Sequence, residues 1–344
     1  MLLVIFGAGA SFDSVPHIPP DRDSVRPIAP FARRLTHDEY RPPLANQLFE
    51  DRDSFLHALK AFPQCKPLIP RLRGNPAIEQ QLAKFEEQAK TFPDRHKQLA
   101  AIRYYIQSVL QHLQTNWQQR HAGVTNYGTF LDEVKRWRTE TDEQVIFVTF
   151  NYDTMLEDAI EQVFRSQMVE LNDYVTHNEF KVVKLHGSIN WFHEIQYPIG
   201  LANHDAVIDA APFLRLSPKV TRVQHVPPNA IPFPALAIPV EKKSEFSCPP
   251  EHLEVLGNAM REVTKIIAIG WRAMEQDFLK MLSANLTGLK SDVDLMVVSG
   301  SADGATGTAA NLGMDKPSQC KRSLIDSGFT GLVNNIGLLE SFLR

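Results

Sequence analysis

The feature that most constrains the fold is a set of five short apolar runs, most of them followed directly by Gly, Asn or Ser. They occupy residues 2–6, 145–150, 182–185, 266–269 and 295–298. Continuous apolar runs of this length are typical of strands buried on both faces of a parallel sheet. Helical patterns lie between most of the runs, and strands that alternate with helices form α/β sheets with right-handed crossovers. We therefore expect an α/β protein.

The first two runs are too far apart for a simple crossover. Residues 12–45, rich in Pro, Arg and Asp, predict an extended loop, and residues 77–92 predict a helix that stops before Pro93. Residues 95–120 predict a long amphipathic helix, because apolar side chains recur every three or four positions: Leu99, Ile102, Ile106, Val109, Leu113 and Trp117. With a further short helix over 130–137, this block predicts an α-helical subdomain on the sheet.

These patterns predict one domain over residues 1–344. Its core, residues 1–15 and 140–344, would be a Rossmann-like parallel sheet of about five to six strands with helices on both faces. The helical insert would occupy residues 46–139. Residues 194–250 contain ten prolines and predict an irregular segment. An amphipathic helix is expected to close the chain at residues 336–343.

Composition excludes several classes of protein. Apolar residues make up 43% of the chain and charged residues 22%, which is typical of globular proteins. The net charge of −4 argues against direct nucleic-acid binding, since phosphate contacts need a concentrated basic surface. The sequence contains no run of 18 apolar residues, so we expect no membrane span.

The three cysteines and the N-terminus bear on location. Cys65, Cys248 and Cys320 are odd in number and form no C-x-x-C pair, so neither a disulfide framework nor a cysteine zinc site is expected. The apolar start ends in Ala8-Gly9-Ala10, which is similar to a signal-peptidase site, but it lacks a basic region and glycine interrupts it early. We expect a cytoplasmic protein.

The first motif with possible chemistry is Gly7-Ala8-Gly9-Ala10-Ser11, directly after the first predicted strand. Glycines one residue apart allow a tight turn whose N–H groups can point at a phosphate. Phe12 stands where the dinucleotide fingerprint has its third glycine, which disfavours an ordinary Rossmann dehydrogenase. A simple turn without a ligand explains the same residues.

The second motif is Thr149-Phe150-Asn151-Tyr152-Asp153, at the end of the next predicted strand. Ligands of open α/β sheets bind beyond the carboxyl ends of the strands. Asn151 offers a donor and an acceptor, which suits a ribose diol or a held water. An Asx turn that caps the following helix is an equally good explanation.

Three further strand ends carry weaker signals. In Lys184-Leu185-His186-Gly187-Ser188, the histidine could take a proton near neutral pH, although a structural histidine is the simpler explanation. Gly270 ends the run at 266–269, and Ser299-Gly300 follow the run at 295–298. A nucleotide could lie across such ends.

In order and spacing, the five islands resemble the sirtuin-like superfamily. Residues 3–11 resemble its glycine loop for the NAD⁺ pyrophosphate, residues 149–153 its T-x-N-x-D motif, and residues 185–188 its L-H-G-S motif. Residues 266–270 and 297–300 resemble the strand ends that hold the second ribose and the adenine. The resemblance implies that Asn151 and His186 are catalytic. It implies NAD⁺ contacts for these residues: Gly7, Ala8, Gly9, Ala10, Ser11, Asp13, Asp153, Gly187, Gly270, Ser299 and Gly300.

The chain also departs from the protein-deacylating sirtuins. No cysteine pair follows His186 to form their zinc module, so no zinc is expected. The glycine loop is followed by a proline-rich stretch with Asp21-Arg22-Asp23 instead of their G-I-P-D-F-R segment. The pattern resembles a divergent bacterial branch of antiphage defence whose members hydrolyse NAD⁺.

The resemblance implies an NAD⁺ hydrolase that yields ADP-ribose and nicotinamide. Protein deacylation, ADP-ribosyl transfer and a non-catalytic NAD⁺ or ADP-ribose sensor remain alternatives. Arg41 and Asn46 could close over the nucleotide, although a solvated loop explains them as well. A cell-killing hydrolase must be held off, so we expect a homo-oligomer or a separate activator protein encoded nearby.

Overall fold

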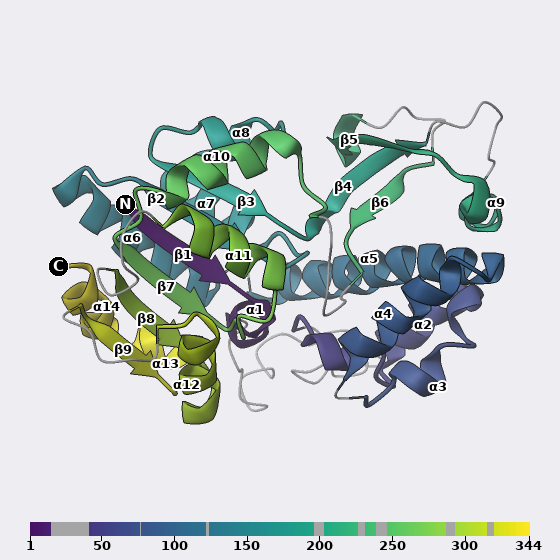
Figure 1. The fold of residues 1–344 in the computed structure, drawn as a ribbon, viewed down its shortest axis with the longest axis horizontal. Coiled ribbons are helices and arrows are strands. Elements are labelled where there is room, and N and C mark those ends of the chain that lie inside the picture. Colours follow the sequence, from purple (N-terminus) through teal and green to yellow (C-terminus); the bar gives the residue numbers. More distant parts are fainter. Residues whose placement is uncertain are drawn as a thin grey trace.

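The computed structural model describes residues 1–14, 41–75, 77–121, 124–195, 203–225, 231–238, 246–286, 293–314 and 320–344. Most of the predicted proline-rich loop, including Asp21 to Asp23, lies outside the described residues. The predicted α/β class is confirmed. A six-stranded parallel sheet forms the centre, flanked by helices (Figure 1).

The central sheet has the strand order β3-β2-β1-β7-β8-β9, and every pairing in it is parallel. Its strands are β1 (Leu2–Phe6), β2 (Val145–Thr149), β3 (Phe180–Lys184), β7 (Lys265–Ile269), β8 (Asp294–Val298) and β9 (Arg322–Ile325). The first five match the five apolar runs. The sixth, β9, is only partly buried, and its mixed composition gave no apolar run to predict it from.

The strand order reverses between β1 and β7, as in doubly wound nucleotide-binding sheets. From β1 the chain builds outward to β2 and β3, then returns to β7 and builds outward to β8 and β9. The connections that leave β1 and β7 run in opposite directions at this point. A crevice therefore opens between them at the carboxyl ends of the strands. Two of the predicted site residues lie at this point: Gly7 follows β1, and Gly270 follows β7.

Helices cover both faces of the sheet (Figure 1). On one face, α6 (Asn126–Thr141) contacts α7 (Met155–Phe164), α13 (Gly328–Asn334) and α14 (Ile336–Leu343). On the other, α10 (Pro250–Met260) packs against α11 (Gln276–Asn285), and α12 (Ala302–Asn311) follows β8. The helix expected at 336–343 is α14. The short helix α8 (Asp173–Thr176) precedes β3.

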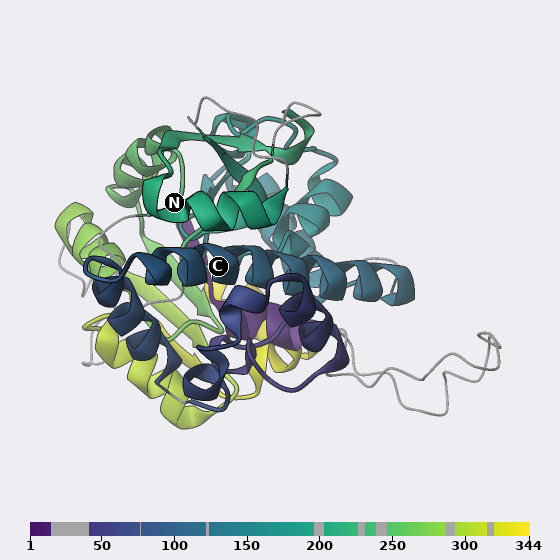
Figure 2. The same ribbon diagram turned by 90° about the vertical axis from the view of Figure 1, so that its right-hand side faces the viewer.

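The predicted helical block begins with η3 (Ala45–Gln47), α2 (Asp53–Ala61), η4 (Pro63–Cys65), α3 (Ile69–Leu72) and α4 (Ile78–Ala89). The long helix α5 (Pro93–His121) follows, with Pro93 as its first residue, where the missing N–H costs nothing. Its side chains Leu99 to Leu113 line a second apolar core, whereas Trp117 belongs to the core of the main sheet. A single helix therefore joins the two cores. Figure 2 shows this helix running between the small sheet and the helices α2 to α4.

Helix α6 falls at the end of the predicted insert, yet it packs on the main sheet. Phe130, Leu131, Val134 and Trp137 are buried in the sheet core. The helix is longer than the expected 130–137. It therefore acts as the crossover helix between β1 and β2.

The segment 194–250, expected to be irregular, contains defined elements where the structure describes it. Helix α9 (His204–Ala210), the turns η5 (Ala211–Phe213) and η6 (Val223–His225), and strands β5 (Leu216–Arg222) and β6 (Phe233–Leu236) occur there. β4 (Gly187–Ile195) pairs with both strands in a three-stranded antiparallel sheet, order β5-β4-β6. Pro234 is tolerated because β6 is an edge strand.

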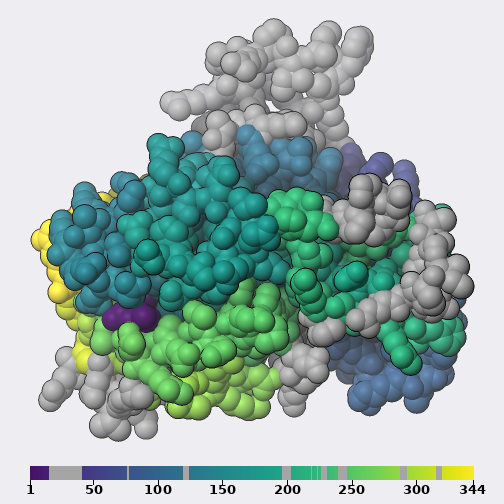
Figure 3. Space-filling view, turned by 90° about the horizontal axis from the view of Figure 1, so that it is seen from above, coloured from purple at the N-terminus to yellow at the C-terminus, as the bar shows by residue number. Residues whose placement is uncertain are grey.

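The small sheet rests on α5. Ile189, Phe233 and Leu236 enter the second apolar core with the α5 side chains. Helix α8 contacts α10. Viewed from above, the teal and green residues of this part of the chain adjoin each other, and residues of the small sheet lie beside them (Figure 3). In the described part of the chain, no helix combines the length and apolar character needed to cross a membrane.

Candidate active site at the carboxyl ends of the strands

The turns after β1 and β7 are in direct backbone contact. Gly7 N donates to Ile269 O (3.0 Å), Gly9 N to Gly270 O (3.0 Å) and Gly270 N to Val298 O (2.9 Å). A Cβ on Gly7 would lie 2.6 Å from Gly270 O, and one on Gly270 would lie 2.2 Å from the turn after β1. Gly270 also has a φ of 60°. Close packing of two turns therefore requires these glycines, whether or not a ligand binds.

The glycine loop runs into the short helix α1 (Ala8–Ser14). Ala10 and Ser11 are buried, whereas Ala8 is half-buried. Phe12, at the position of the absent third glycine, carries the Arg41 guanidinium 3.7 Å above the centre of its ring. Arg41 therefore lies beside the loop, while Asn46 belongs to the turn η3.

Asn151 is the second residue after β2, and its side chain points toward the glycine loop. Only 7% of the residue is exposed. Its Nδ2 lies 2.9 Å from Gly7 O, 2.9 Å from Ser11 Oγ and 3.2 Å from Tyr127 Oη. The structure thus brings the first and second predicted motifs together.

Asp153 is buried two residues further on. Its Oδ1 accepts from Met155 N (3.1 Å) at the start of α7, as the Asx-turn explanation expects. Burial raises the pKa of Asp153 above its usual value, and the nearby Lys184 opposes this shift. Ser11 also lowers this pKa, but burial has the larger effect.

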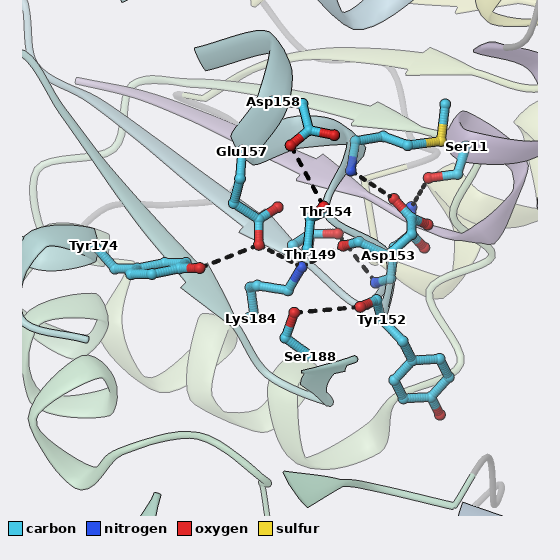
Figure 4. A network of polar contacts seen from close by, with 12 residues as sticks. Ser11, Thr149, Tyr152, Asp153, Thr154, Glu157, Asp158, Tyr174, Lys184 and Ser188 are labelled. Atoms are coloured by element: carbon cyan, nitrogen blue, oxygen red, sulfur yellow. Dashed lines mark hydrogen bonds and ion pairs between the residues drawn. The ribbon is translucent and has the colours of Figure 1, made fainter. Parts of the chain in front are cut away.

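A buried polar network ties the ends of β2 and β3 together (Figure 4). Lys184, with no exposed surface, donates from Nζ to Glu157 Oε1 (2.7 Å) and to the carbonyl oxygen of Asp153. Tyr174 Oη donates to the same Glu157 oxygen (3.3 Å). Burial raises the pKa of Tyr174 well above its usual value, so its hydroxyl stays protonated. Because the network joins consecutive strand ends, it holds the second and third motifs in register.

His186 follows β3 and is 7% exposed. Its ring centroid lies 4.9 Å from that of Phe150 and 6.1 Å from that of Tyr152. These are the two neighbours of Asn151 in the chain. Ser188 Oγ donates to Tyr152 O (3.3 Å), which adds a second link between the motifs.

Gly187 is required by packing. Its φ is 79°, and a Cβ would fall 1.8 Å from Ala235 O in β6. His186 O accepts from Ala237 N (3.0 Å) just after β6. The small antiparallel sheet therefore starts within the histidine motif itself.

Asp13 and the residues after β8 occupy less central positions. The Asp13 carboxylate accepts from Thr330 N (2.8 Å) near the start of α13. Ser299 N bonds Ile325 O (2.8 Å). A Cβ on Gly300 would meet no atom within 4 Å, so packing of the described residues does not require glycine there. Both residues were predicted to contact NAD⁺. In the structure Asp13 caps the start of α13, and Gly300 borders open space.

Sequence reasoning missed the roles of Tyr127, Glu157 and Lys184. Tyr127 lies on a helix whose pattern is ordinary, and nothing local marks it as a partner of Asn151. Lys184 carried a detectable signal, because a lysine that ends a buried strand needs a buried partner.

Neither a scan against protein-family models nor a search of curated proteins finds a match to this chain. In the part of the chain that is described, no group of three or more His, Cys, Asp or Glu side chains is arranged to hold a metal ion.

Proposed function

We propose that this protein is an NAD⁺ hydrolase that cleaves the nicotinamide–ribose bond to give ADP-ribose and nicotinamide. The observation that supports the proposal most directly is the meeting of three motifs at one edge of the sheet. The Asn151 amide bonds the Gly7–Ser11 loop, and the neighbours of Asn151 contact the His186 ring. These are the motifs whose combination resembles the sirtuin-like superfamily.

The position in the fold also supports a nucleotide ligand. The loop follows β1 at the point where the strand order reverses, which is where doubly wound sheets bind nucleotides. In the proposal, the turn between Gly7 and Ser11 faces the pyrophosphate. Gly300, where a Cβ would have open space around it, borders the adenine side.

The proposed reaction is hydrolysis at the anomeric carbon. The bond between C1 of the ribose and the nicotinamide nitrogen breaks, and its electron pair leaves with neutral nicotinamide. The ribose passes through an oxocarbenium-like state, as in glycoside cleavage. A water oxygen then bonds C1, and His186 takes the proton from that water or from a ribose hydroxyl. Asn151 holds the ribose or the water.

The test is NAD⁺ turnover by the purified protein. General acid–base catalysis contributes about 10²–10⁴-fold, so His186→Ala should lower kcat by about that factor. Asn151→Ala should lower it as strongly. His193→Ala, on β4, is the matched control and should retain activity, because its Nδ1 bonds Ser217 O in the small sheet. Full turnover by both site variants would refute the mechanism.

Two assays separate the alternatives. NAD⁺ binding without turnover, measured by calorimetry, would identify a sensor. Product that forms only with an acetylated peptide would identify a deacylase. ADP-ribose released without peptide supports the hydrolase, and a chromatographic comparison with cyclic ADP-ribose identifies the product.

We further propose that the enzyme acts in the cytoplasm as an antiphage effector that depletes NAD⁺. Such an enzyme has to be inactive until infection, through homo-oligomerisation or a separate activator. Light scattering with and without NAD⁺ measures the oligomer. Turnover by the chain alone, compared with turnover in the presence of proteins encoded beside it, locates the control.

A further inference from the structure

We propose that Tyr127 is a positioning residue that sets the orientation of the Asn151 side chain. The inference rests on the proposed function for its catalytic consequence, but its structural part can be tested without NAD⁺. Tyr127 lies in the first turn of α6. In the sequence it precedes Asn151, whereas the histidine motif follows Asn151.

The Tyr127 hydroxyl lies within hydrogen-bond distance of two site residues. Its Oη is 2.9 Å from Ser11 Oγ and 3.2 Å from Asn151 Nδ2. Burial leaves 1% of the residue exposed and raises its pKa well above the usual value, so the hydroxyl keeps its proton. The ring is held independently, edge-on to Phe6 (5.0 Å between centroids) and Phe329 (5.5 Å).

Three acceptors surround the Asn151 amide nitrogen. Nδ2 donates to Gly7 O and Ser11 Oγ, both at 2.9 Å, and lies 3.2 Å from Tyr127 Oη. The amide nitrogen carries two protons, so the two hydroxyls share one of them. The Tyr127 and Ser11 hydroxyls are also bonded to each other, and either can be the donor. The Tyr127 hydroxyl therefore acts on the Asn151 amide both directly and through Ser11.

The carbonyl group of Gly7 determines the orientation of the Asn151 amide. Gly7 O can only accept, so the nitrogen must face the glycine loop. With Nδ2 surrounded by Gly7, Ser11 and Tyr127, the Asn151 Oδ1 points the other way, and no described residue donates to it. That oxygen is available to accept from a ribose hydroxyl or a water.

The first turn of α6 also holds the rest of α1. Asn126 Nδ2 donates to Asp13 O (2.8 Å) and to Thr330 Oγ1 (2.9 Å). Neighbouring residues of one helical turn thus contact both ends of the segment from Ser11 to Asp13. Tyr127 differs from Asn126 in reaching the predicted catalytic side chain.

Tyr127→Phe removes the hydroxyl and keeps the ring. We expect kcat for NAD⁺ to fall about tenfold with KM changed less than about twofold, because one hydrogen bond that orients a catalytic group is lost while binding contacts remain. Tyr105→Phe is the matched control: it removes another buried hydroxyl, which donates to Leu48 O (2.9 Å) in the second core. Its kcat should equal that of the wild type.

The structural readout is the NMR signal of the Asn151 side-chain NH₂ in protein labelled with ¹⁵N-asparagine, identified by its absence in Asn151→Ala. Tyr127→Phe should shift this signal, and Tyr105→Phe should leave it in place. If Tyr127→Phe does not fold by circular dichroism, Tyr127→Met also removes the hydroxyl while it keeps an apolar side chain, and it should produce the same shift.

The outcomes are distinct. An unchanged NH₂ signal in the folded variant overturns the positioning role, whatever the activity. A shifted signal with unchanged kcat in an active wild type overturns the catalytic consequence. A wild type that does not turn over NAD⁺ refutes the proposed function, and the NMR comparison still decides whether Tyr127 orients Asn151.

Discussion

At Gly270 the turn after β7 packs directly against the turn after β1. Its φ is left-handed, and a Cβ added to it would lie only 2.2 Å from Ala10 N, so any other residue would strain the turn. Glycine at this position therefore has a packing cause that is independent of nucleotide binding. The same holds for Gly187, whereas Gly300 has room for a side chain.

We expect Gly270→Ala to lower the free energy of unfolding by about 2–4 kcal/mol, because a left-handed alanine and overpacking each cost of the order of 1–3 kcal/mol. Gly257→Ala is the control, since no atom lies within 4 Å of its Cβ and it sits inside α10. That change should raise stability by about 0.5–1 kcal/mol. Urea unfolding measures both, and equal stabilities would contradict the packing argument.

At the scale of elements, the ends of β2 and β3 depend on a buried ion pair. Lys184 ends β3, and Glu157 lies in the first turn of α7. Their contact therefore couples β3 to the helix that follows the neighbouring strand β2. Burying both charges is favourable only while each has its partner. Removing either partner alone therefore leaves a buried charge without its counter-ion.

Lys184→Met should lower the free energy of unfolding by about 3–5 kcal/mol, because it leaves the Glu157 carboxylate buried without its cation. The double variant Lys184→Met with Glu157→Gln should regain more than half of the loss. Lys280→Met serves as the control, since its ion pair with Asp277 is exposed and contributes at most about 1 kcal/mol. A double variant no more stable than Lys184→Met would exclude the pairing as the cause.

At the scale of the whole molecule, α5 connects two apolar cores. Its N-terminal part packs with α2, α4 and the small sheet, and Trp117 near its end packs in the core of the main sheet. All four tryptophans of the chain belong to the core of the main sheet: Trp117, Trp137, Trp191 and Trp271. Tryptophan fluorescence therefore reports on one core and far-ultraviolet circular dichroism on both.

Phe85→Ala removes a fully buried ring from the second core and should cost about 3–5 kcal/mol. Because α5 is continuous, we expect fluorescence and circular dichroism to show the same lowered unfolding midpoint. Phe92→Ala, at a side chain 61% exposed, should leave the midpoint in place. A fluorescence midpoint that stays at the wild-type value in Phe85→Ala would show that the cores unfold independently.

The sequence by itself determined the α/β class, five of the six main strands, the long helix α5 and the closing helix α14. These features have local patterns, since a doubly buried strand and an amphipathic helix each require apolar residues at fixed spacing. The sequence also indicated Asn151, His186 and the glycine loop, because each follows a strand. Their role in catalysis stays a prediction.

Only the tertiary structure decided which side chains meet. The partnership of Tyr127 with Asn151, the burial of Lys184 against Glu157 and the use of Asp13 as a cap for α13 join residues far apart in the chain. The small sheet depends on β4 finding two proline-containing edge strands. Such contacts are selected by burial and by hydrogen bonds between distant segments, which no local pattern encodes.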